Sequence, residues 1–392
     1  MHITDAQRQL LKTLWFDGPL SRSDLSRLLA ITPNAAGGIA AQLQQLGLVS
    51  EMTAETAALR GRPKTPLQIE GRRQSIVGLA VSPGRVEACR FGFAGHPLDR
   101  PHVKTLTAGA SPLAAAARLL PAVLHPRTLL IALTVPGLVD QKSGNIMLSS
   151  AFPDAKSHSV LPVLKAAAGI PLIVGNNLHA AAAGWTLSHR RPFTDDSLLV
   201  NIADGQIGAA ILINGKPNRG CILGANELGH TRLPMAAPSC YCGGRGCIER
   251  IFSSGFLAGK SRGASKGILE ARLRANAPGD RRLGIAVSSL AMVLSNAINF
   301  LRPANVIIAT PFAEYRHFIS GLTADIRRGL LPHIGSRVEI SVWNRCISGS
   351  AHLAAWLGIA GIVLPGWSDY EAQPEHQDRH STPRLQIAPA DE

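Results

Sequence analysis

Four metal-ligating side chains lie close together between residues 230 and 247. They follow the spacing H-x9-C-x-C-x4-C, with His230 first and Cys240, Cys242 and Cys247 after it. One imidazole and three thiolates complete the tetrahedral shell of a structural zinc ion and leave no position open for catalysis. Three glycines between Cys242 and Cys247 let the backbone turn tightly enough for the sulfurs to face one ion. The spacing predicts a structural zinc site; the alternative is three surface thiols beside an unrelated histidine.

Bulk composition predicts a cytoplasmic protein of two or three folded domains. The chain has 392 residues, of which 46% are hydrophobic and 17% charged, which argues against a mostly disordered chain. We find no run of about 18 uncharged apolar residues and no secretory signal at the start, so we expect no membrane contact. In such a protein the scattered cysteines, Cys89, Cys221 and Cys346, are expected to be small buried apolar residues rather than disulfide partners.

The positive charge favours a polyanionic partner such as nucleic acid. The formal net charge is +14, and Lys and Arg gain affinity for nucleic acid by releasing counterions. Residues 1–75 hold nine Lys/Arg against six Asp/Glu, so +3 lies there and +11 beyond. Most of the positive charge therefore lies outside the N-terminal segment, and the net charge alone is weak support for DNA binding.

The first 72 residues predict a winged helix-turn-helix domain. Apolar side chains at helical spacing mark a helix over residues 5–16, and Ser21 can cap a second helix that ends near Leu29. Thr32 and Pro33 can start a third helix that ends at Leu46. Two short extended pieces follow, over residues 48–52 and 66–69. Three helices and a hairpin are typical of DNA-binding domains; the alternative is a small helical packing module without a DNA role.

Residues 76–365 predict an α/β protein with two lobes and a ligand cleft between them. Apolar runs at 76–81, 129–135, 172–174, 198–202, 209–213 and 306–309 alternate with Ala-rich helical stretches such as 113–124 and 178–187. We place the first lobe at 76–188 and the second at 189–365. The polar tail, 366–392, is expected to be disordered.

The segment around the cysteines resembles the signature of the ROK family, named for repressors, open reading frames and sugar kinases. The matching residues are Glu227-x-Gly229-His230 and Cys240-x-Cys242-Gly243-x-x-Gly246-Cys247-x-Glu249. Residues 134–140 (TVPGLVD) and 171–177 (PLIVGNN) resemble two further family turns, and residues 21–51 followed by 61–69 resemble the winged helix of its repressor branch. The resemblance implies a winged helix-turn-helix followed by a two-lobed actin-like, ribonuclease H-like sugar-kinase fold.

The resemblance also implies a hexose site that shares a residue with the zinc site. Its members would be Asn176, Glu227, His230 and Glu249. Amide and carboxylate groups hold neutral sugars by bidentate hydrogen bonds, each contributing roughly 1.5–3 kcal/mol when the acceptor is charged. His230 would contact a sugar hydroxyl with one ring nitrogen and zinc with the other, so zinc would fix the binding loop. The alternative for the two glutamates is plain surface carboxylates.

The sequence lacks the features with which ROK kinases bind ATP and transfer phosphate. Residues 80–84 read AVSPG where the kinases carry Asp-x-Gly-Gly-Thr, which removes a carboxylate and adds a proline without an N–H. Residues 204–208 begin with Asp204 where the kinases have glycine, and its charge would repel a triphosphate. Asn177 replaces the general base and cannot accept a proton. Pro311 follows the last strand in place of a Gly-Gly turn. We expect no ATP and no catalytic residue.

We expect the third helix to enter the major groove of double-stranded DNA. The residues that would approach base edges are Thr32, Asn34, Ala35 and Ala36, with Asn34 able to pair bidentately with adenine. Gly37 and Gly38 would allow close approach to DNA or to the preceding helix. Arg60, Arg62 and Lys64 suit a wing in a narrow, A/T-rich minor groove; the alternative is a solvated basic loop.

The combined expectation is a transcription regulator, in habit a repressor, of sugar uptake or catabolism genes. One head recognises too little sequence, so we expect a homodimer or dimer of dimers on a palindromic operator. A sugar or sugar derivative would close the cleft and shift operator affinity. Two alternatives remain at this point: a ROK sugar kinase with an appended regulatory domain, and a regulator controlled by sequestration on a protein.

Overall fold

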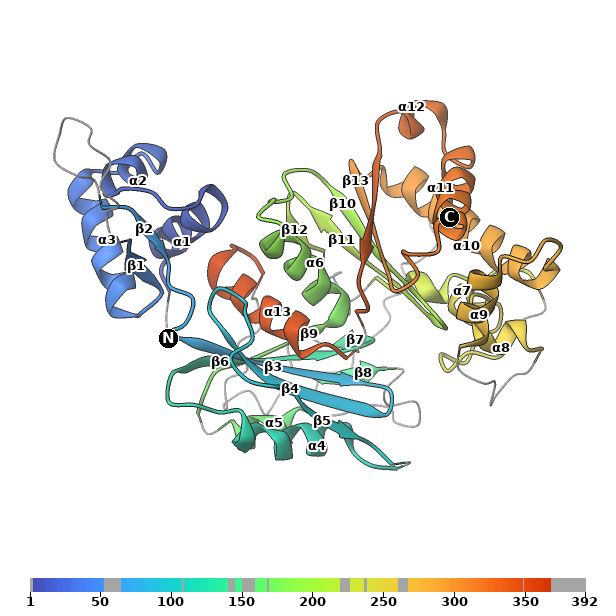
Figure 1. Cartoon of the computed structure of the whole chain (residues 1–392), viewed down its shortest axis with the longest axis horizontal. Helices are drawn as coiled ribbons and strands as arrows, with labels where there is room; N and C mark the ends of the chain where they lie inside the picture. The colour runs from blue at the N-terminus through green and yellow to red at the C-terminus, as the bar shows by residue number, and fades with distance from the viewer. Residues whose placement is uncertain are drawn as a thin grey trace, which may run out of the picture.

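A computed structural model describes residues 3–52, 65–107, 109–139, 145–149, 159–167, 169–218, 226–235, 238–259, 267–347 and 349–367. The chain starts with a small head and continues into two α/β lobes (Figure 1). The predicted tail beyond 367, like Cys221 and Asp140, lies outside these ranges.

The head forms the predicted winged helix-turn-helix. Its elements are α1 (Asp5–Asp17), α2 (Arg22–Leu28), α3 (Pro33–Gln45), β1 (Val49–Glu51) and β2 (Leu67–Ile69). A side-chain oxygen of Thr4, Ser21 or Thr32 accepts a backbone N–H at the start of each helix, which satisfies one otherwise unpaired donor. The two strands pair antiparallel. The apolar faces of α1 and α3, including Leu10, Leu14 and Leu43, are fully buried.

The first lobe is a five-stranded sheet with the strand order β5-β4-β3-β6-β9. The strands are β3 (Ser75–Ser82), β4 (Arg85–Gly92), β5 (His102–Thr105), β6 (Thr128–Val135) and β9 (Leu172–Asn176). Alternate side chains of β3 face opposite sides, so Val77 and Leu79 pack on one face and Ile76 on the other. The first face is covered by α4 (Pro112–Leu119), η1 (Leu120–Ala122) and α5 (Leu161–Ala166), and β7 (Leu138–Val139) pairs with β8 (Ile146–Leu148) beside it.

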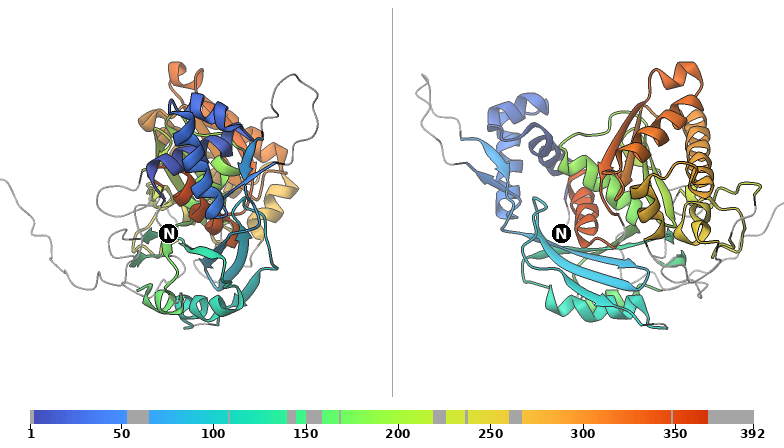
Figure 2. Two further views of the ribbon diagram at one scale, coloured as in Figure 1. Left: turned by 90° about the vertical axis from the view of Figure 1, so that its left-hand side faces the viewer. Right: turned by 45° about the vertical axis from the view of Figure 1, so that its right-hand side comes forward.

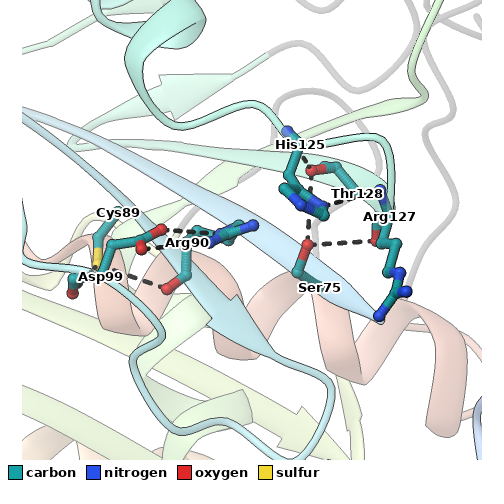
Figure 3. Close-up of polar contacts among 7 residues, drawn as sticks. All are labelled: Ser75, Cys89, Arg90, Asp99, His125, Arg127 and Thr128. Atoms are coloured by element: carbon teal, nitrogen blue, oxygen red, sulfur yellow. Dashed lines mark hydrogen bonds and ion pairs between the residues drawn. The ribbon is translucent and has the colours of Figure 1, made fainter. Parts of the chain in front are cut away.

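Polar contacts fix two places in this sheet (Figure 3). The Ser75 hydroxyl donates to the backbone carbonyl of Arg127 at 3.2 Å, where β3 and β6 begin side by side. The Arg90 guanidinium donates to both carboxylate oxygens of Asp99, at 2.8 and 3.2 Å, and so holds the chain after β4.

The cysteines outside the zinc motif fall into two classes. Cys89 is buried, its thiol donates to the backbone carbonyl of Asp99 at 3.3 Å, and burial raises its pKa to about 11. This confirms the prediction of a small buried residue at this position. The same prediction was wrong for Cys346, which is exposed because it follows an edge strand.

The second lobe is a five-stranded sheet with the order β12-β11-β10-β13-β14. Its strands are β10 (Ser197–Ala203), β11 (Gln206–Ile213), β12 (Lys216–Pro217), β13 (Asn305–Thr310) and β14 (Glu339–Asn344). The lobe also contains η2 (Leu228–His230), α7 (Ile248–Ile251), α8 (Ser254–Leu257), α9 (Ile268–Ala275), α10 (Arg281–Leu301), α11 (Arg316–Arg328) and α12 (Pro332–Gly335).

Two helices lie between the two sheets and join the lobes (Figures 1 and 2). They are α6 (Asn177–Ser188) and α13 (Ala351–Val363), which pack against each other. Helix α13 also contacts β3 and β6, whereas α6 contacts β10 and β11. The predicted second lobe, 189–365, therefore needs correction, because its last helix packs on the first sheet.

Helix α10 is long and apolar enough to span a membrane by length and composition alone, although its serines and asparagines mean that it is not a continuous apolar run. It is the one helix of this kind in the described ranges. Its side chains Leu290, Leu294 and Ile298 are buried in the core of the second lobe, while Phe300 is exposed. Core helices of folded domains have the same length and composition. The packing of these three side chains in the second lobe is typical of such a core helix.

Candidate functional site

The four predicted zinc ligands converge in the second lobe. One ligand atom from each of His230, Cys240, Cys242 and Cys247 lies within 4.8 Å of all the others. The sulfurs of Cys242 and Cys247 are 3.7 Å apart, and the Cys240 sulfur is 3.5 Å from His230 Nδ1. A zinc–sulfur bond of about 2.3 Å gives a tetrahedron with sulfur–sulfur edges of roughly 3.8 Å. The cluster therefore has the donor atoms and the size that can hold a tetrahedral metal ion.

Backbone pairing brings the distant ends of this motif together. The Leu233 N–H donates to the Gly246 carbonyl at 2.8 Å, and the Ile248 N–H donates to the Thr231 carbonyl at 3.0 Å. Gly246 has φ +81°, and a Cβ there would lie 2.3 Å from the Leu233 carbonyl oxygen. This position requires glycine for both reasons. The segment after His230 thus runs beside Cys247.

Two glutamates flank the ring of His230. Its Nε2 is 3.6 Å from a Glu227 carboxylate oxygen, and its Nδ1 is 3.9 Å from one of Glu249. The Cys240 thiol also donates to Glu249, at 3.2 Å. Gly229 permits this convergence, because a Cβ there would lie 2.1 Å from the Ile207 carbonyl oxygen of β11. The structure therefore brings together three of the four predicted sugar residues.

The carboxylates of Glu227 and Glu249 lack basic side chains that would neutralise them among the described residues. Among the described residues, neither Glu227 nor Glu249 forms an ion pair with lysine or arginine. Burial raises the pKa of Glu227 above its usual value and that of Glu249 to about 7. A buried carboxylate is costly unless hydrogen-bond donors face it. Both side chains are thus suited to a ligand that supplies hydroxyl donors.

Tyr241 is a neighbour of the site that the sequence analysis missed. Its hydroxyl lies 3.1 Å from His230 Nε2, and the two rings meet edge to face with centroids 5.1 Å apart. Burial raises the pKa of the Tyr241 hydroxyl, so it is uncharged. Its role could not be predicted from the sequence, because the middle position of a C-x-C motif can hold many residue types.

Asn176 serves the fold with part of its amide. Its oxygen accepts the Leu178 N–H at 2.7 Å and caps α6, and its nitrogen donates to the Gly137 carbonyl at 2.7 Å. An amide has two donors and two lone pairs, so one of each is left for a ligand. No contact joins Asn176 to the two glutamates, but α6 and η2 both pack against β11.

A family model described as "ROK family" matches residues 110–360, which includes the whole of the cysteine cluster and both glutamates. The chain belongs to the ROK family. Among its relatives, the DNA-binding transcriptional repressor Mlc of Escherichia coli K12 is 22% identical over 82% of this chain and 85% of its own length. The xylose repressor of Caldicellulosiruptor bescii is 24% identical over 62% of each chain. The curated relatives thus include repressors, while an N-acetylmannosamine kinase of Citrobacter koseri matches 28% of this chain at 30% identity.

Solved ROK structures share the fold. A transcriptional regulator described as a homologue of the E. coli MLC protein has TM-score 0.69 and 21% identity, covering 93% of this chain and 99% of that one. A glucokinase from Streptomyces griseus in complex with glucose and AMPPNP has TM-score 0.54 and 19% identity, covering 72% and 97%. The regulator and the kinase therefore share one two-lobed ROK fold with this chain.

One of the two turns that the sequence resemblance aligns with ROK phosphate loops is engaged in internal contacts. The Asp204 carboxylate accepts the Ser254 N–H at 2.7 Å and also the Ser254 hydroxyl, at the start of α8. The Gly205 N–H donates to the Phe252 carbonyl at 3.0 Å. In the first lobe, Pro83 and Gly84 form a two-residue hairpin turn between β3 and β4. The Gly205 N–H, one donor that a phosphate could use in the second turn, is thus engaged within the fold.

Three of the four residues of α3 and its N-cap that were predicted to contact DNA are exposed. Thr32, Asn34 and Ala35 are exposed at the start of α3, and the Thr32 hydroxyl accepts the Ala35 N–H at 3.2 Å. Ala36 is wrong as a contact residue, because it is fully buried on the face toward the other helices. A Cβ at Gly37 or Gly38 would meet nothing within 4 Å, so neither glycine serves helix packing. Arg60, Arg62 and Lys64 lie outside the described residues.

The exposed face of α3 also includes residues that the sequence analysis did not single out. Ala41, Gln42 and Gln45 are exposed along it. Gln42 is partly engaged, since its side-chain oxygen accepts the Gln7 amide at 2.9 Å. The helical period alone could have grouped Asn34, Ala41 and Gln45 on one face.

Proposed function

We propose that this protein is a DNA-binding transcription regulator, a repressor of sugar uptake or catabolism genes. Its head binds double-stranded DNA and its ROK domain binds a sugar or sugar derivative. One observation carries the proposal: a winged helix-turn-helix with the start of α3 exposed precedes a ROK domain in one chain. Relatives that match over much of the chain are named repressors, which supports repression as the mode.

The ROK domain would hold a structural zinc ion through His230, Cys240, Cys242 and Cys247. Three sulfurs and one nitrogen match the donors that zinc prefers, and their separations match a tetrahedral shell. When bound, zinc would supply a fixed charge that holds the loop and the His230 ring in place. Four protein ligands leave no coordination position for a substrate.

The sugar site would combine Asn176, Glu227, His230 and Glu249. Nδ1 of His230 faces the Cys240 sulfur, and Nε2 faces Glu227. One ring nitrogen can therefore serve the metal while the other contacts a sugar hydroxyl. The two carboxylates, without cationic partners, would accept hydrogen bonds from neighbouring hydroxyls of the ring.

The ROK domain would bind its sugar without phosphorylating it and without ATP. Asn177 stands at the place of the general base, whose loss costs roughly 10²–10⁴ in rate. Asp204 accepts the N–H of Ser254, the first residue of α8, and places a negative charge in the turn after β10. We expect ATP-dependent phosphorylation of a panel of hexoses and amino sugars to stay at background; turnover of any of them would favour the kinase alternative.

The head would recognise DNA as part of a dimer or dimer of dimers. Thr32, Asn34 and Ala35 would approach base edges in the major groove, and Arg60, Arg62 and Lys64 an A/T-rich minor groove. Sugar closing the cleft between the lobes would change the spacing of two heads on a palindromic operator.

Recovery of bound fragments from sheared genomic DNA tests this function. The full-length protein should enrich a small set of fragments that share a palindromic, A/T-rich sequence. A variant that lacks residues 1–72 keeps the ROK domain and is the control. Equal recovery with the two proteins, or no shared sequence, would contradict the proposal.

A further inference from the structure

A cavity of about 370 Å³ lies where the head meets the ROK domain. Its walls come from α1 and the turn after it, from β2, from the β4–β5 connection, from the end of α6 and from α13. In Figure 1 this junction lies on the side of the molecule away from α9, α10 and α11. None of the proposed zinc or sugar residues lines the cavity. Small-molecule sites commonly have volumes of about 300–1,000 Å³ and favour domain interfaces.

One wall of the cavity consists of two fixed tryptophans. Trp15 of α1 and Trp356 of α13 meet edge to face with centroids 6.1 Å apart. The Trp15 indole N–H donates to the Leu187 carbonyl at 3.0 Å. Trp356 packs so closely on Gly95 that a Cβ there would lie 2.1 Å from its ring. Fixed aromatic surfaces of this kind suit a flat apolar ligand face, such as an aromatic ring or one face of a pyranose.

The ionisable side chains that line the cavity are all basic. Its titratable lining residues are His96, Arg190 and His352, and no aspartate or glutamate lines it. His352 has both ring nitrogens engaged, with the Gly95 carbonyl at 2.9 Å and Arg345 at 3.2 Å. In contrast, the exposed side chains of Arg190 and His96 have no hydrogen bond or ion pair within the described part of the chain. An unpaired guanidinium is a ready partner for a carboxylate or phosphate.

We propose that this cavity binds a small ring-containing anion, with the ring against Trp15 and Trp356 and the anionic group on Arg190. Sugar phosphates and ring carboxylates share this chemistry. Because α1 and β2 of the head form part of the wall, the bound anion would also fix the head against the ROK domain. Only this last consequence rests on the proposed function.

Calorimetric titration of the full-length protein, without DNA, tests the site. The two probes are glucose 6-phosphate and benzoate, with glucose and inorganic phosphate as ring-only and anion-only references. At least one probe should bind, and Arg190→Asn should weaken it on the order of tenfold to a hundredfold, the loss expected for one charge-assisted hydrogen bond. Asparagine is chosen because Arg190 has φ +48°, a conformation that asparagine tolerates.

Three controls make the result specific. Arg191→Asn removes the adjacent exposed arginine, which does not line the cavity, and should leave binding unchanged. Arg190→Lys should restore part of the affinity. Glu249→Ala, in the proposed sugar site, should leave the anion bound.

Three outcomes would overturn the proposal. They are no binding of either probe, equal losses in Arg190→Asn and Arg191→Asn, and a loss caused by Glu249→Ala but not by Arg190→Asn. Binding through Arg190 with no effect on DNA affinity would support the site and count only against its proposed link to the head.

Discussion

At the scale of residues, the account depends on one imidazole ring with two different neighbours. Nδ1 of His230 lies 3.5 Å from the Cys240 sulfur, while Nε2 lies 3.1 Å from the Tyr241 hydroxyl and 3.6 Å from Glu227. A ring held by a metal through one nitrogen presents the other in a fixed direction. The metal and the sugar should therefore be linked through His230.

Removing one cysteine ligand should remove both zinc and the sugar response. In Cys242→Ser the shell loses a thiolate, so we expect zinc content to fall from about one per chain toward zero, together with sugar binding. Metal analysis and calorimetry measure the two effects. Cys346→Ser changes an exposed cysteine outside the cluster and should keep both. Sugar binding that persists in metal-free Cys242→Ser would contradict the link.

Removing either carboxylate beside His230 should abolish the sugar response but not DNA binding. For Glu227→Ala and for Glu249→Ala we expect sugar affinity to fall by roughly 10–100-fold, from the loss of 1.5–3 kcal/mol of charge-assisted hydrogen bonding. Apo-protein affinity for DNA should stay unchanged, because the head is intact. Unaltered sugar induction in both variants would exclude this assignment.

The sequence was informative at this scale where residues lie close together in the chain. The zinc ligands could be predicted because their spacing is local and their chemistry is restrictive. The burial of Ala36 was missed because the face of α3 that packs against α1 depends on tertiary contacts. The bonds that Asn176 makes within the fold were missed for the same reason, since one partner, Gly137, is far away in sequence.

At the scale of elements, α1 and α13 connect the head to the sensor. The Arg8 guanidinium donates to the carbonyls of Gly361 and Ile362 in the last turn of α13. Trp15 packs on Trp356 of the same helix. Since α13 also packs on β3 and on α6, movement between the lobes would reach the head through these contacts.

Weakening this connection should reduce communication rather than binding. Trp15→Phe removes the hydrogen bond to Leu187, and we expect the sugar-induced change in DNA affinity to shrink by about 0.5–2 kcal/mol. Sugar affinity and apo-protein DNA affinity should each change little. Trp343→Phe, on β14, is the matched control, because Trp343 packs on Trp185 and not on α1. Equal coupling in wild type and Trp15→Phe would exclude this route.

Helix α3 should carry the sequence preference of the head. Asn34→Ala removes an exposed amide at its start, so we expect operator affinity to fall by about 1–3 kcal/mol, with relaxed preference at one base pair. Competition with single-base operator variants measures the preference. Asn296→Ala changes an exposed asparagine on α10 and should have no effect. A uniform loss over all operator variants would mean that Asn34 only contacts phosphate.

Elements with strong local patterns could be predicted, and elements defined by their partners could not. The apolar runs of β3, β6, β10, β11 and β13 form central strands, and that of β9 forms an edge strand; all six were anticipated. Strands β5 and β14 are edge strands with exposed side chains, so their sequences lack an apolar run. Helix α13 packs on strands of the first sheet that lie far from it in the sequence. Local sequence patterns could not predict this contact.

At the scale of the whole molecule, the ROK domain has a fold shared with sugar kinases, and we propose that it serves here to sense a sugar. The ROK domain has the two carboxylates and the cysteine cluster, while the Asp204–Gly205 turn is bonded internally and Asn177 stands where the resemblance implies a general base. Adding the head converts differential sugar binding into differential DNA binding, provided that two heads act on one operator.

Operator affinity with and without sugar tests this account most directly. Fluorescence anisotropy of a labelled operator, at one fixed salt concentration, would be repeated with hexoses, amino sugars and sugar phosphates. The account predicts that at least one of these ligands shifts the dissociation constant by roughly 5–150-fold, and that Glu249→Ala abolishes the shift. An operator affinity that no sugar changes, or a shift that Glu249→Ala retains, would contradict it.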